Sequence, residues 1–339
     1  MGNDSKKINK GKYMYETKET YALMFMAIGM SIGYALGFSL FDNQSISMSI
    51  GMLIGLVLGQ GIHQQVSTSS VEFLDAMSEE IEDVKPYLKE TKYIDYSDKV
   101  IQEKVNELLD IVNKKWEKNY TADEAECIIY LSKTINAEDY KNEENTKLLA
   151  RQWIKDKNND INKKQIKKFI KKVNEGLKEY KTEIVKTFYE FVRDEIPHSF
   201  DIESNVITVK ASEVLKNKTG ICYTKSNLLA AMLRVVGIPC GLCYEHLTLQ
   251  EDDKMGFVVH CFNAVYLWDD WIFLDARGNK EGIDAQFIKD DIKLSFVPRE
   301  EYDEYFYYGI YEDAHEETMK IIEDSHTIAE VMDNIPDQI

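Results

Sequence analysis

The chain has 339 residues and a formal net charge of −18 at pH 7, from 59 acidic and 41 basic side chains. This excess of acid argues against DNA or RNA as a general partner, because phosphate binding needs a net basic surface. The five cysteines are odd in number and irregularly spaced, which does not fit a disulfide framework. We therefore expect reduced thiols, as in a cytosolic compartment.

The N-terminal region predicts a membrane anchor. Residues 1–20 form a polar leader with five lysines, and two uncharged runs follow at 21–41 and 46–62. A bilayer span needs about 17 to 25 apolar residues, so 21–62 is expected to form a two-helix transmembrane hairpin. The alternative is a buried apolar hairpin of a soluble protein. Both runs have a glycine-zipper spacing that lets helices pack closely in lipid and suits self-association, through Gly29, Gly33, Gly37, Gly51, Gly55 and Gly59.

The orientation of this hairpin follows from the position of the lysines. Basic residues favour the cytoplasmic side of a membrane, which places the leader in the cytoplasm. Two crossings return the chain to the same side. We therefore expect a multi-pass protein of the cell membrane whose remaining residues, from 63 onward, face the cytoplasm.

Residues 70–180 are charged, poor in glycine and proline, and mainly helical in pattern. Helices are predicted near 71–89, 98–116, 121–135, 143–156 and 163–179, and a further one at 181–194. The segment 163–172 carries six lysines around an apolar stripe that includes Ile166, Phe169, Ile170 and Val173. A basic amphipathic helix of this kind can lie on an anionic membrane. A solvated helix with one face toward the core has the same pattern, and the sequence leaves both readings open.

The pattern changes after residue 200. A strand-like run occupies 206–209, a short helix 211–216, and runs rich in β-forming residues occupy 240–244, 257–267 and 271–276. An acidic, tyrosine-rich end finishes in a helix near 313–333. Helices followed by antiparallel strands indicate an α+β fold.

A single cysteine stands at the start of the helix predicted after Gly220. Apolar residues recur at spacings of three and four from Leu228 to Val236, and Gly237 and Pro239 end the helix. The free N–H groups and the positive dipole end at Cys222 favour a thiolate, which is the nucleophilic form. The backbone N–H of Cys222 is also the natural donor for an oxyanion.

Two residues downstream complete a possible catalytic set. His260 and Asp275 lie on consecutive predicted strands, and a two-residue turn that pairs 267 with 270 puts both side chains on one face of the sheet. His260 would then accept the Cys222 proton, and Asp275 would hold the imidazole ring.

These residues resemble the core motifs of the transglutaminase-like superfamily. The first motif is Gly220, Cys222, Arg234, Gly237, Ile238 and Pro239, and the next two are His260, Asn263, Val265 and Tyr266, then Trp271, Leu274 and Asp275. The runs 191–201 and 274–280 resemble a bacterial branch of small transglutaminase-like proteins. The similarity covers 87–109 and 182–311. One departure is Phe262, where many members have tryptophan.

The resemblance implies a papain-like core, in which a catalytic helix packs on an antiparallel sheet, and a Cys222–His260–Asp275 triad. It divides the chain into a leader (1–20), the hairpin (21–62), a helical region (70–180) with an insertion at about 112–180, a catalytic core (181–312) and an acidic tail (313–339). The implied activity is that of a membrane-anchored thiol enzyme. Such an enzyme would act on amide bonds of proteins or peptides through a cysteine thioester, as a cysteine protease, an amidohydrolase or an acyltransferase. The alternative is a catalytically silent binding module of the same fold.

We expect no cofactor and no metal. The spacing of Cys240, Cys243 and His246 suggests zinc, but a strand points the two cysteines to opposite faces. The acidic clusters at 300–301 and 303–304 lack the ligand spacing of a calcium loop.

The remaining polar candidates are read as structural. On a strand, the Cys261 side chain points away from the face of His260. His198 is interpreted as a structural contact. Arg277 and Asn279 follow Asp275 closely and either line the cleft or support local packing.

Overall fold

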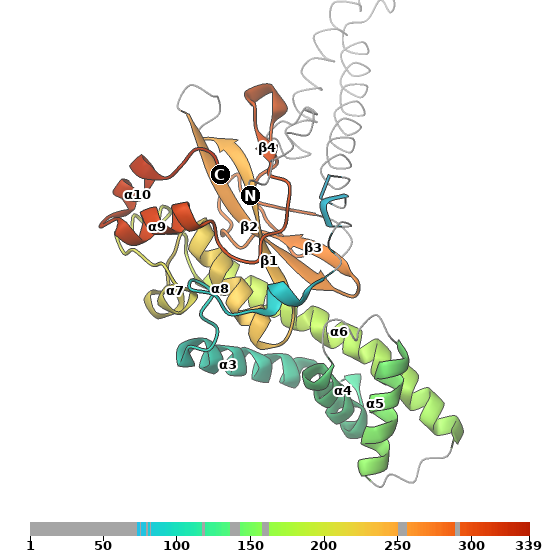
Figure 1. Cartoon of the computed structure of the whole chain (residues 1–339). Helices are drawn as coiled ribbons and strands as arrows, with labels where there is room; N and C mark the ends of the chain where they lie inside the picture. Colours follow the sequence, from blue (N-terminus) through green and yellow to red (C-terminus); the bar gives the residue numbers. More distant parts are fainter. Residues whose placement is uncertain are drawn as a thin grey trace, which may run out of the picture.

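The computed structural model describes residues 73–339 except 75, 79–80, 82, 117–118, 136–142, 158–162, 250–255 and 289–291. At its centre is a four-stranded antiparallel sheet in the order β3-β2-β1-β4 (Figure 1). The strands are β1 (Cys240–Thr248), β2 (Phe257–Leu267), β3 (Asp270–Leu274) and β4 (Tyr305–Phe306). Helices and an antiparallel sheet together confirm the predicted α+β class.

The β2–β3 hairpin has the predicted register. Leu267 pairs with Asp270, and the two turn residues, Trp268 and Asp269, have φ angles of 62° and 70°. Two consecutive residues in this left-handed region form the hairpin turn whose twist matches that of the strands. The Trp268 indole N–H donates to the Thr182 hydroxyl at 3.1 Å, which fixes the turn against a neighbouring helix.

Two helices cover one face of the sheet. Helix α8 (Cys222–Val235) begins at the predicted cysteine and packs on β1 and β2, and α6 (Lys163–Glu195) packs against α8 (Figure 1). A short helix, α7 (Ala211–Asn217), precedes α8. Apolar side chains on this face, such as Val265 and Leu274, join the main core.

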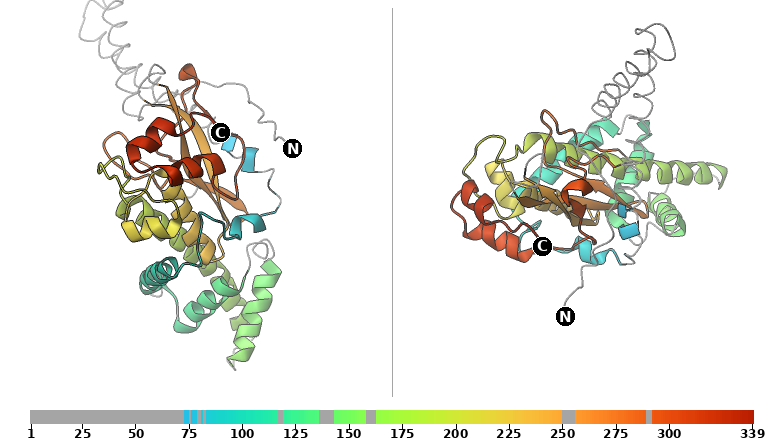
Figure 2. Two further views of the ribbon diagram at one scale, coloured as in Figure 1. Left: turned by 60° about the vertical axis from the view of Figure 1, so that its left-hand side comes forward. Right: turned by 90° about the horizontal axis from the view of Figure 1, so that it is seen from above.

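The opposite face is covered by the first described residues and by apolar residues that follow β3, such as Leu294 and Ile310. Leu74, Met77 and Tyr87, the last in the 3₁₀ turn η1 (Lys85–Leu88), pack with Phe262 and Phe273. The C-terminal segment contains η5 (Glu300–Tyr302), α9 (Glu316–Asp324) and α10 (Ile328–Asn334). Helix α9 lies beside α8, where Met319 contacts Asn227, and α10 packs against α9 (Figure 2).

A helical region extends from the sheet, below it in Figure 1. It contains α3 (Lys99–Trp116), α4 (Ala122–Thr134), α5 (Glu143–Asp156) and the first half of α6. Helix α4 begins with a capping box in which Thr121 and Glu124 each accept a backbone N–H of the other. The bounds of α3, α4 and α5 agree with the sequence prediction to within one residue.

Helix α6 is one continuous helix where two were expected. The chain between 163 and 195 contains no proline, and Gly176 is tolerated within the helix. A Cβ at Gly176 would lie 2.5 Å from Ile128 and 2.8 Å from Tyr120. The close approach of α4 therefore requires glycine and explains why this residue does not end the helix.

Three other predicted elements are wrong in extent or type. Within 71–89, helix is present at residues 73, 74 and 76–78, and Pro86 lies in a separate 3₁₀ turn. The run 206–209 has no strand pairing. The helix expected at 313–333 is two helices, because Thr327 accepts the Glu330 N–H and starts α10 as an N-cap.

The predicted transmembrane hairpin at 21–62 lies outside the described residues. Within the described ranges, no helix combines the length and the apolar character needed to cross a membrane.

Candidate active site

Cys222 is the first residue of α8 and is partly buried. All five cysteines lie in the described part of the chain and are free thiols, and of these Cys222 is partly exposed while the other four are buried. Its N-cap residue, Ile221, provides no side-chain cap. The Cys222 backbone N–H instead donates to His198 Nε2 at 3.1 Å.

His260 and Asp275 meet as the register requires. Asp275 Oδ2 lies 2.8 Å from His260 Nε2. The carboxylate also accepts the backbone N–H groups of Arg277 at 2.9 Å and of Ser295 at 3.1 Å. Burial by itself would raise the pKa of Asp275, but His260 and these donors lower it to about 2. Asp275 is therefore a fixed carboxylate that orients the imidazole.

Cys222, the third residue of the predicted triad, contacts the imidazole ring of His260. The Cys222 thiol interacts with His260, and because Asp275 takes Nε2, the ring atom left for the thiol is Nδ1. Burial opposes charge on both groups. The charge and hydrogen bond of His260, with the Cys261 N–H, nevertheless lower the pKa of Cys222, and Asp275 and Cys222 raise the pKa of His260. The geometry thus favours a thiolate–imidazolium pair.

His198 is the residue of this site whose position the sequence did not predict. Burial, together with the cations Arg277 and Lys225, holds the pKa of His198 well below its usual range, so the ring is neutral. Nε2 accepts the Cys222 N–H at 3.1 Å, and Nδ1 faces the Phe200 backbone N–H at 3.4 Å. His198 therefore caps α8 at the N–H that we expected to serve an oxyanion. The only sequence signal was its place in a Pro-His-Ser segment after a helix.

Lys225 joins three parts of the site. It lies one turn into α8, is fully buried, and donates its amine to the backbone carbonyls of Ile196 and Arg277, the latter at 2.7 Å. Ile196 precedes His198, and Arg277 follows Asp275. Burial lowers the pKa of Lys225 to about 7. Its two hydrogen bonds fix the loops of His198 and Asp275 to the helix that carries Cys222.

Replacement of Lys225 by methionine is expected to lower the free energy of unfolding by about 2–4 kcal/mol, since two buried carbonyls lose their donor. Methionine keeps the length of the side chain, so little of the effect comes from lost volume. Denaturant unfolding of the full chain measures the change. Lys320→Met, on the exposed side of α9, is the matched control. Equal stability of Lys225→Met and the control would contradict this role.

The possible zinc ligands do not come together. Cys240 and Cys243 point to opposite faces of β1 and pack in different clusters. Burial raises the pKa of Cys240 to about 12 and that of Cys243 well above its usual value, so both are unreactive thiols. The His246 ring stacks between Phe257 and Tyr305.

Arg277 and Asn279 have structural partners. The Arg277 guanidinium forms two hydrogen bonds with Asp201, at 2.8 and 3.1 Å. The Asn279 side chain donates to the Ala285 carbonyl and accepts the Ala285 N–H. These contacts hold the loop after Asp275 in place.

A second carboxyl group lies close to the His260–Asp275 pair. Glu245 of β1 is directly opposite His260 in the register, and each of the three residues has a donor or acceptor atom within 4.8 Å of the others. These residue types also occur in metal sites. His260 Nε2 and Asp275 Oδ2 are already hydrogen-bonded to each other, so we assign these two residues to the catalytic set rather than to a metal site.

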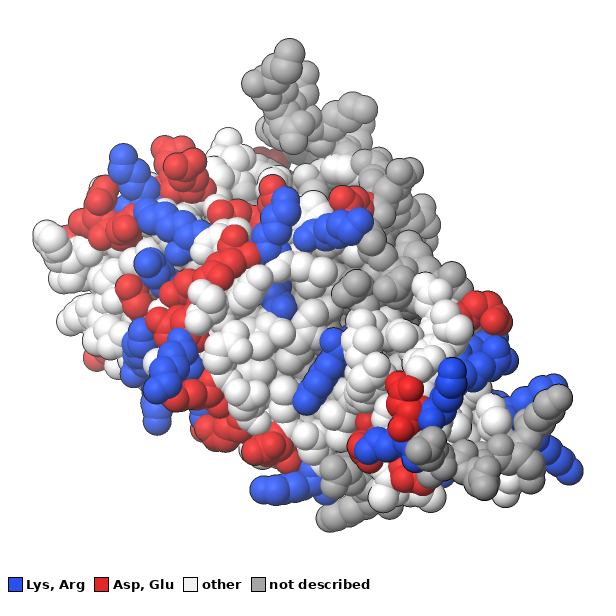
Figure 3. All heavy atoms as spheres, turned by 60° about the horizontal axis from the view of Figure 1, so that its bottom comes forward, with Lys and Arg blue, Asp and Glu red and all other residues white. Residues whose placement is uncertain are grey.

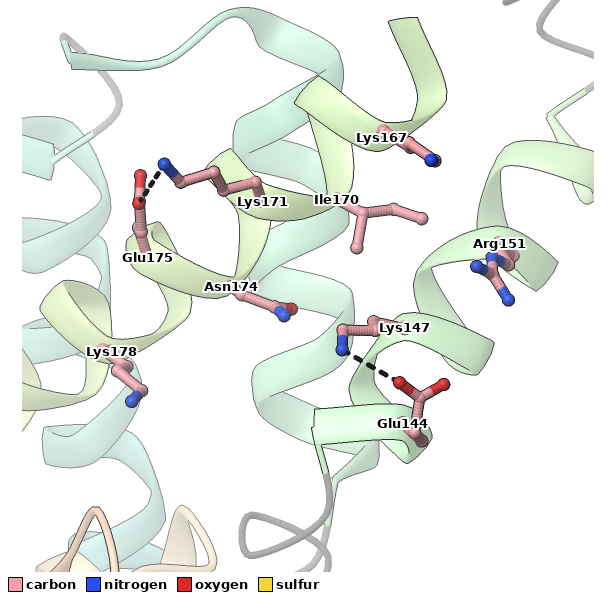
Figure 4. Close-up of a pocket in the computed structure, with 9 residues that line it drawn as sticks. All are labelled: Glu144, Lys147, Arg151, Lys167, Ile170, Lys171, Asn174, Glu175 and Lys178. Carbon is pink, nitrogen blue, oxygen red and sulfur yellow. Dashed lines mark hydrogen bonds and ion pairs between the residues drawn. The ribbon is translucent and has the colours of Figure 1, made fainter. Parts of the chain in front are cut away.

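The lysine-rich start of α6 borders a separate cavity of about 480 Å³ (Figure 4). Five basic and two acidic side chains from α5 and α6 line it, and the face of the helical region in Figure 3 carries both signs of charge. Phe169, Ile170 and Val173 of the apolar stripe are buried and Ile166 is partly buried, and Phe169 stacks on Trp153 at 5.9 Å between ring centroids. The stripe therefore faces the core. This agrees with a solvated helix that has one core-facing side, and not with a helix whose apolar face lies on a membrane.

Residues 167–276 match the family model of the transglutaminase-like superfamily. The chain therefore contains a transglutaminase-like domain, which includes Cys222, His260 and Asp275. The match begins in α6, inside the stretch expected to be an insertion. No match was found among the curated proteins.

Proposed function

We propose that the protein is a thiol enzyme that cleaves amide bonds of proteins or peptides through a thioester on Cys222. The observation that carries the proposal is the placement of His260 between Cys222 and Asp275, with 2.8 Å between Nε2 and Oδ2 and with the charge of His260 lowering the pKa of the Cys222 thiol. Members of the transglutaminase-like superfamily are usually cysteine-dependent enzymes, which supports the same assignment.

The chemistry follows from the charge of each group. The Cys222 thiolate attacks the amide carbonyl carbon, and the tetrahedral intermediate collapses as His260 Nδ1 gives its proton to the leaving amine or ammonia. The products are a Cys222 thioester and the free amine. His260, now neutral, removes a proton from the incoming water, which releases a carboxylic acid and the thiol. Asp275 stabilises the imidazolium in both halves.

The Cys222 N–H supports the oxyanion in this proposal. It lies at the fixed start of a helix, where the dipole also favours negative charge. His198 Nε2 accepts this N–H in the described structure, so the carbonyl oxygen of the substrate would take over the N–H from His198.

Hydrolysis is the proposed fate of the thioester, because water is abundant and no side-chain pocket for an amine was identified among the described residues. The membrane hairpin at 21–62, its self-association and a cytoplasmic catalytic domain belong to the proposal. They are supported by the two uncharged runs, the glycine spacing and the lysine-rich leader. A reporter fused after His63 that scores as extracytoplasmic would overturn the orientation.

The test uses the full chain in detergent with a peptide library, with and without a primary amine, followed by mass analysis. Cleaved peptides indicate a protease, glutamine converted to glutamate a deamidase, and amine adducts an acyltransferase. Cys222→Ala is the control and should abolish every product. If no peptide changes, and Cys222 reacts with a thiol-directed electrophile no faster than Cys240 or Cys243, the silent binding module replaces this proposal.

A further inference from the structure

Glu245 is a buried acid without a described hydrogen-bond partner. Its exposed fraction is 0%, and neither carboxyl oxygen is within hydrogen-bonding range of a partner among the described residues. The β1–β2 register places it directly across from His260, and its carboxyl lies within 4.8 Å of the reactive atoms of His260 and Asp275. The side chain therefore points into the polar cluster of the proposed site.

Two other buried acids near the sheet, Asp275 and Glu304, have hydrogen-bond donors. Asp275 accepts two backbone N–H groups in addition to its contact with His260. Glu304 forms a salt bridge with Arg299 at 2.8 Å and accepts the Thr248 hydroxyl at 2.7 Å. An ionised carboxylate buried without such donors costs several kcal/mol. The absence of described donors at Glu245 therefore favours the neutral acid.

The charges around Glu245 come from four elements. His260 on β2 favours a negative Glu245, whereas Asp275 after β3, Glu304 before β4 and Cys222 on α8 disfavour it. Burial is the largest effect, and the pKa of Glu245 is raised well above its usual value. The burial and the acidic neighbours thus agree with the hydrogen-bond geometry.

Two acids, the Cys222 thiol and the Glu245 carboxyl, lie beside one imidazole. In water the carboxyl is the stronger acid by about four pKa units. Within the protein, Cys222 receives a hydrogen bond from His260, another from the Cys261 N–H, and the field of the α8 dipole. Glu245 has no described donor. Because the hydrogen-bond donors lie at Cys222 and not at Glu245, the Cys222 thiol becomes a stronger acid than the Glu245 carboxyl.

We propose that Glu245 is a positioning residue of this site, which stays a neutral carboxylic acid and so leaves the negative charge beside His260 to the Cys222 sulfur. The proposal rests on the proposed function of the triad and deepens it. One proton passes from Cys222 Sγ to His260 Nδ1, and Glu245 keeps its own. With thiolate, imidazolium and Asp275 carboxylate, the site has a net charge of −1, and an ionised Glu245 would make it −2.

The charge count predicts that removal of the Cys222 thiolate changes the pKa of Glu245, and this change can be measured. In Cys222→Ala the imidazolium and Asp275 cancel, so ionisation of Glu245 takes the site only from 0 to −1. Loss of a neighbouring negative charge typically lowers a carboxyl pKa by about one unit or more. Glu245 should therefore lose its proton at a lower pH in Cys222→Ala than in the wild type.

Infrared difference spectroscopy of the full chain in detergent tests this inference. The carbonyl stretch of a protonated carboxylic acid is separate from the bands of carboxylates and amides, and Glu245→Gln identifies the contribution of Glu245. We expect the band in the wild type at neutral pH, and a midpoint about one pH unit or more lower in Cys222→Ala. Cys127→Ala, which removes a buried thiol in α4, should leave the midpoint unchanged.

Two results would overturn the inference. One is the absence of the Glu245 band at neutral pH, and the other is the same midpoint in Cys222→Ala and the wild type. Peptide turnover is a separate measurement. Turnover without the band would reject the role of Glu245 and keep the thiol enzyme, whereas the band without turnover would keep the neutral acid and reject the enzyme. Glu245→Asp, which keeps an acid and should shift the band rather than remove it, assigns the band if Glu245→Gln does not fold.

Discussion

Alkylation of Cys222 at pH 7 is expected to slow by roughly 30-fold when His260 is replaced by alanine, because an ordinary thiol of pKa about 8.5 is only a few per cent ionised there. Amide turnover should fall further, by about 10²–10⁴-fold, since the leaving amine also loses its proton donor. Rates of iodoacetamide labelling at Cys222, followed by mass analysis, measure the first effect.

The pH profile separates loss of the base from general damage. The thiolate–imidazolium pair of the wild type exists above the lowered pKa of Cys222 and below the raised pKa of His260. Labelling should therefore stay fast at mildly acidic pH and fall only when the thiol is protonated. In His260→Ala, labelling should rise with pH as for an ordinary cysteine. His326→Ala, at an exposed histidine, should match the wild type, and wild-type labelling of His260→Ala would refute the pairing.

Replacement of Arg234 by methionine is expected to lower the free energy of unfolding by about 3–6 kcal/mol, because one buried and two partly buried carbonyls lose their donors at about 1–3 kcal/mol each. Arg234 makes two hydrogen bonds to the Cys240 carbonyl and one each to the carbonyls of Lys89 and Glu312. These link the end of α8 to β1, to the segment after η1 and to the C-terminal segment.

An effect of this size is a large part of the 5–15 kcal/mol that stabilises a typical protein, so the soluble yield should fall as well. Arg234 lies twelve residues from Cys222 along α8, about 18 Å, which separates this effect from catalysis. Urea unfolding monitored by tryptophan fluorescence measures it. Arg151→Met, at an exposed arginine of α5, is the control and should change stability by less than about 0.5 kcal/mol. A similarly small change in Arg234→Met would show that its hydrogen bonds are replaced by water.

The elements predicted best are those set by local signals. The start of α8 at Cys222 followed from the glycine before it and from the apolar spacing after it, and its end from Gly237 and Pro239. For the β2–β3 hairpin, the sequence showed that a two-residue turn pairing 267 with 270 puts His260 and Asp275 on one face, and it did not fix the register. The structure has this pairing.

Other wrong predictions depend on distant contacts. Two helices were expected at 163–179 and 181–194, but α6 is continuous, and the glycine inside it, Gly176, packs closely against Ile128 of α4 and Tyr120 just before α4. The run 206–209 has the composition of a strand, yet a strand forms only where another strand pairs with it. Periodicity reports which face of a segment is apolar, and it does not report which partner covers that face.

The sequence by itself determined which residues carry the proposed chemistry, because the spacing around Cys222, His260 and Asp275 is local to one helix and one hairpin. The tertiary structure alone decided the state of these groups. His198 accepts the Cys222 N–H from a loop 24 residues away, and Lys225 joins the two loops of the site. In our proposal Glu245 is protonated because no donor to its carboxyl group is described. Charge in a buried site depends on the donors and charges that neighbouring segments bring to it, and those segments meet only in the folded chain.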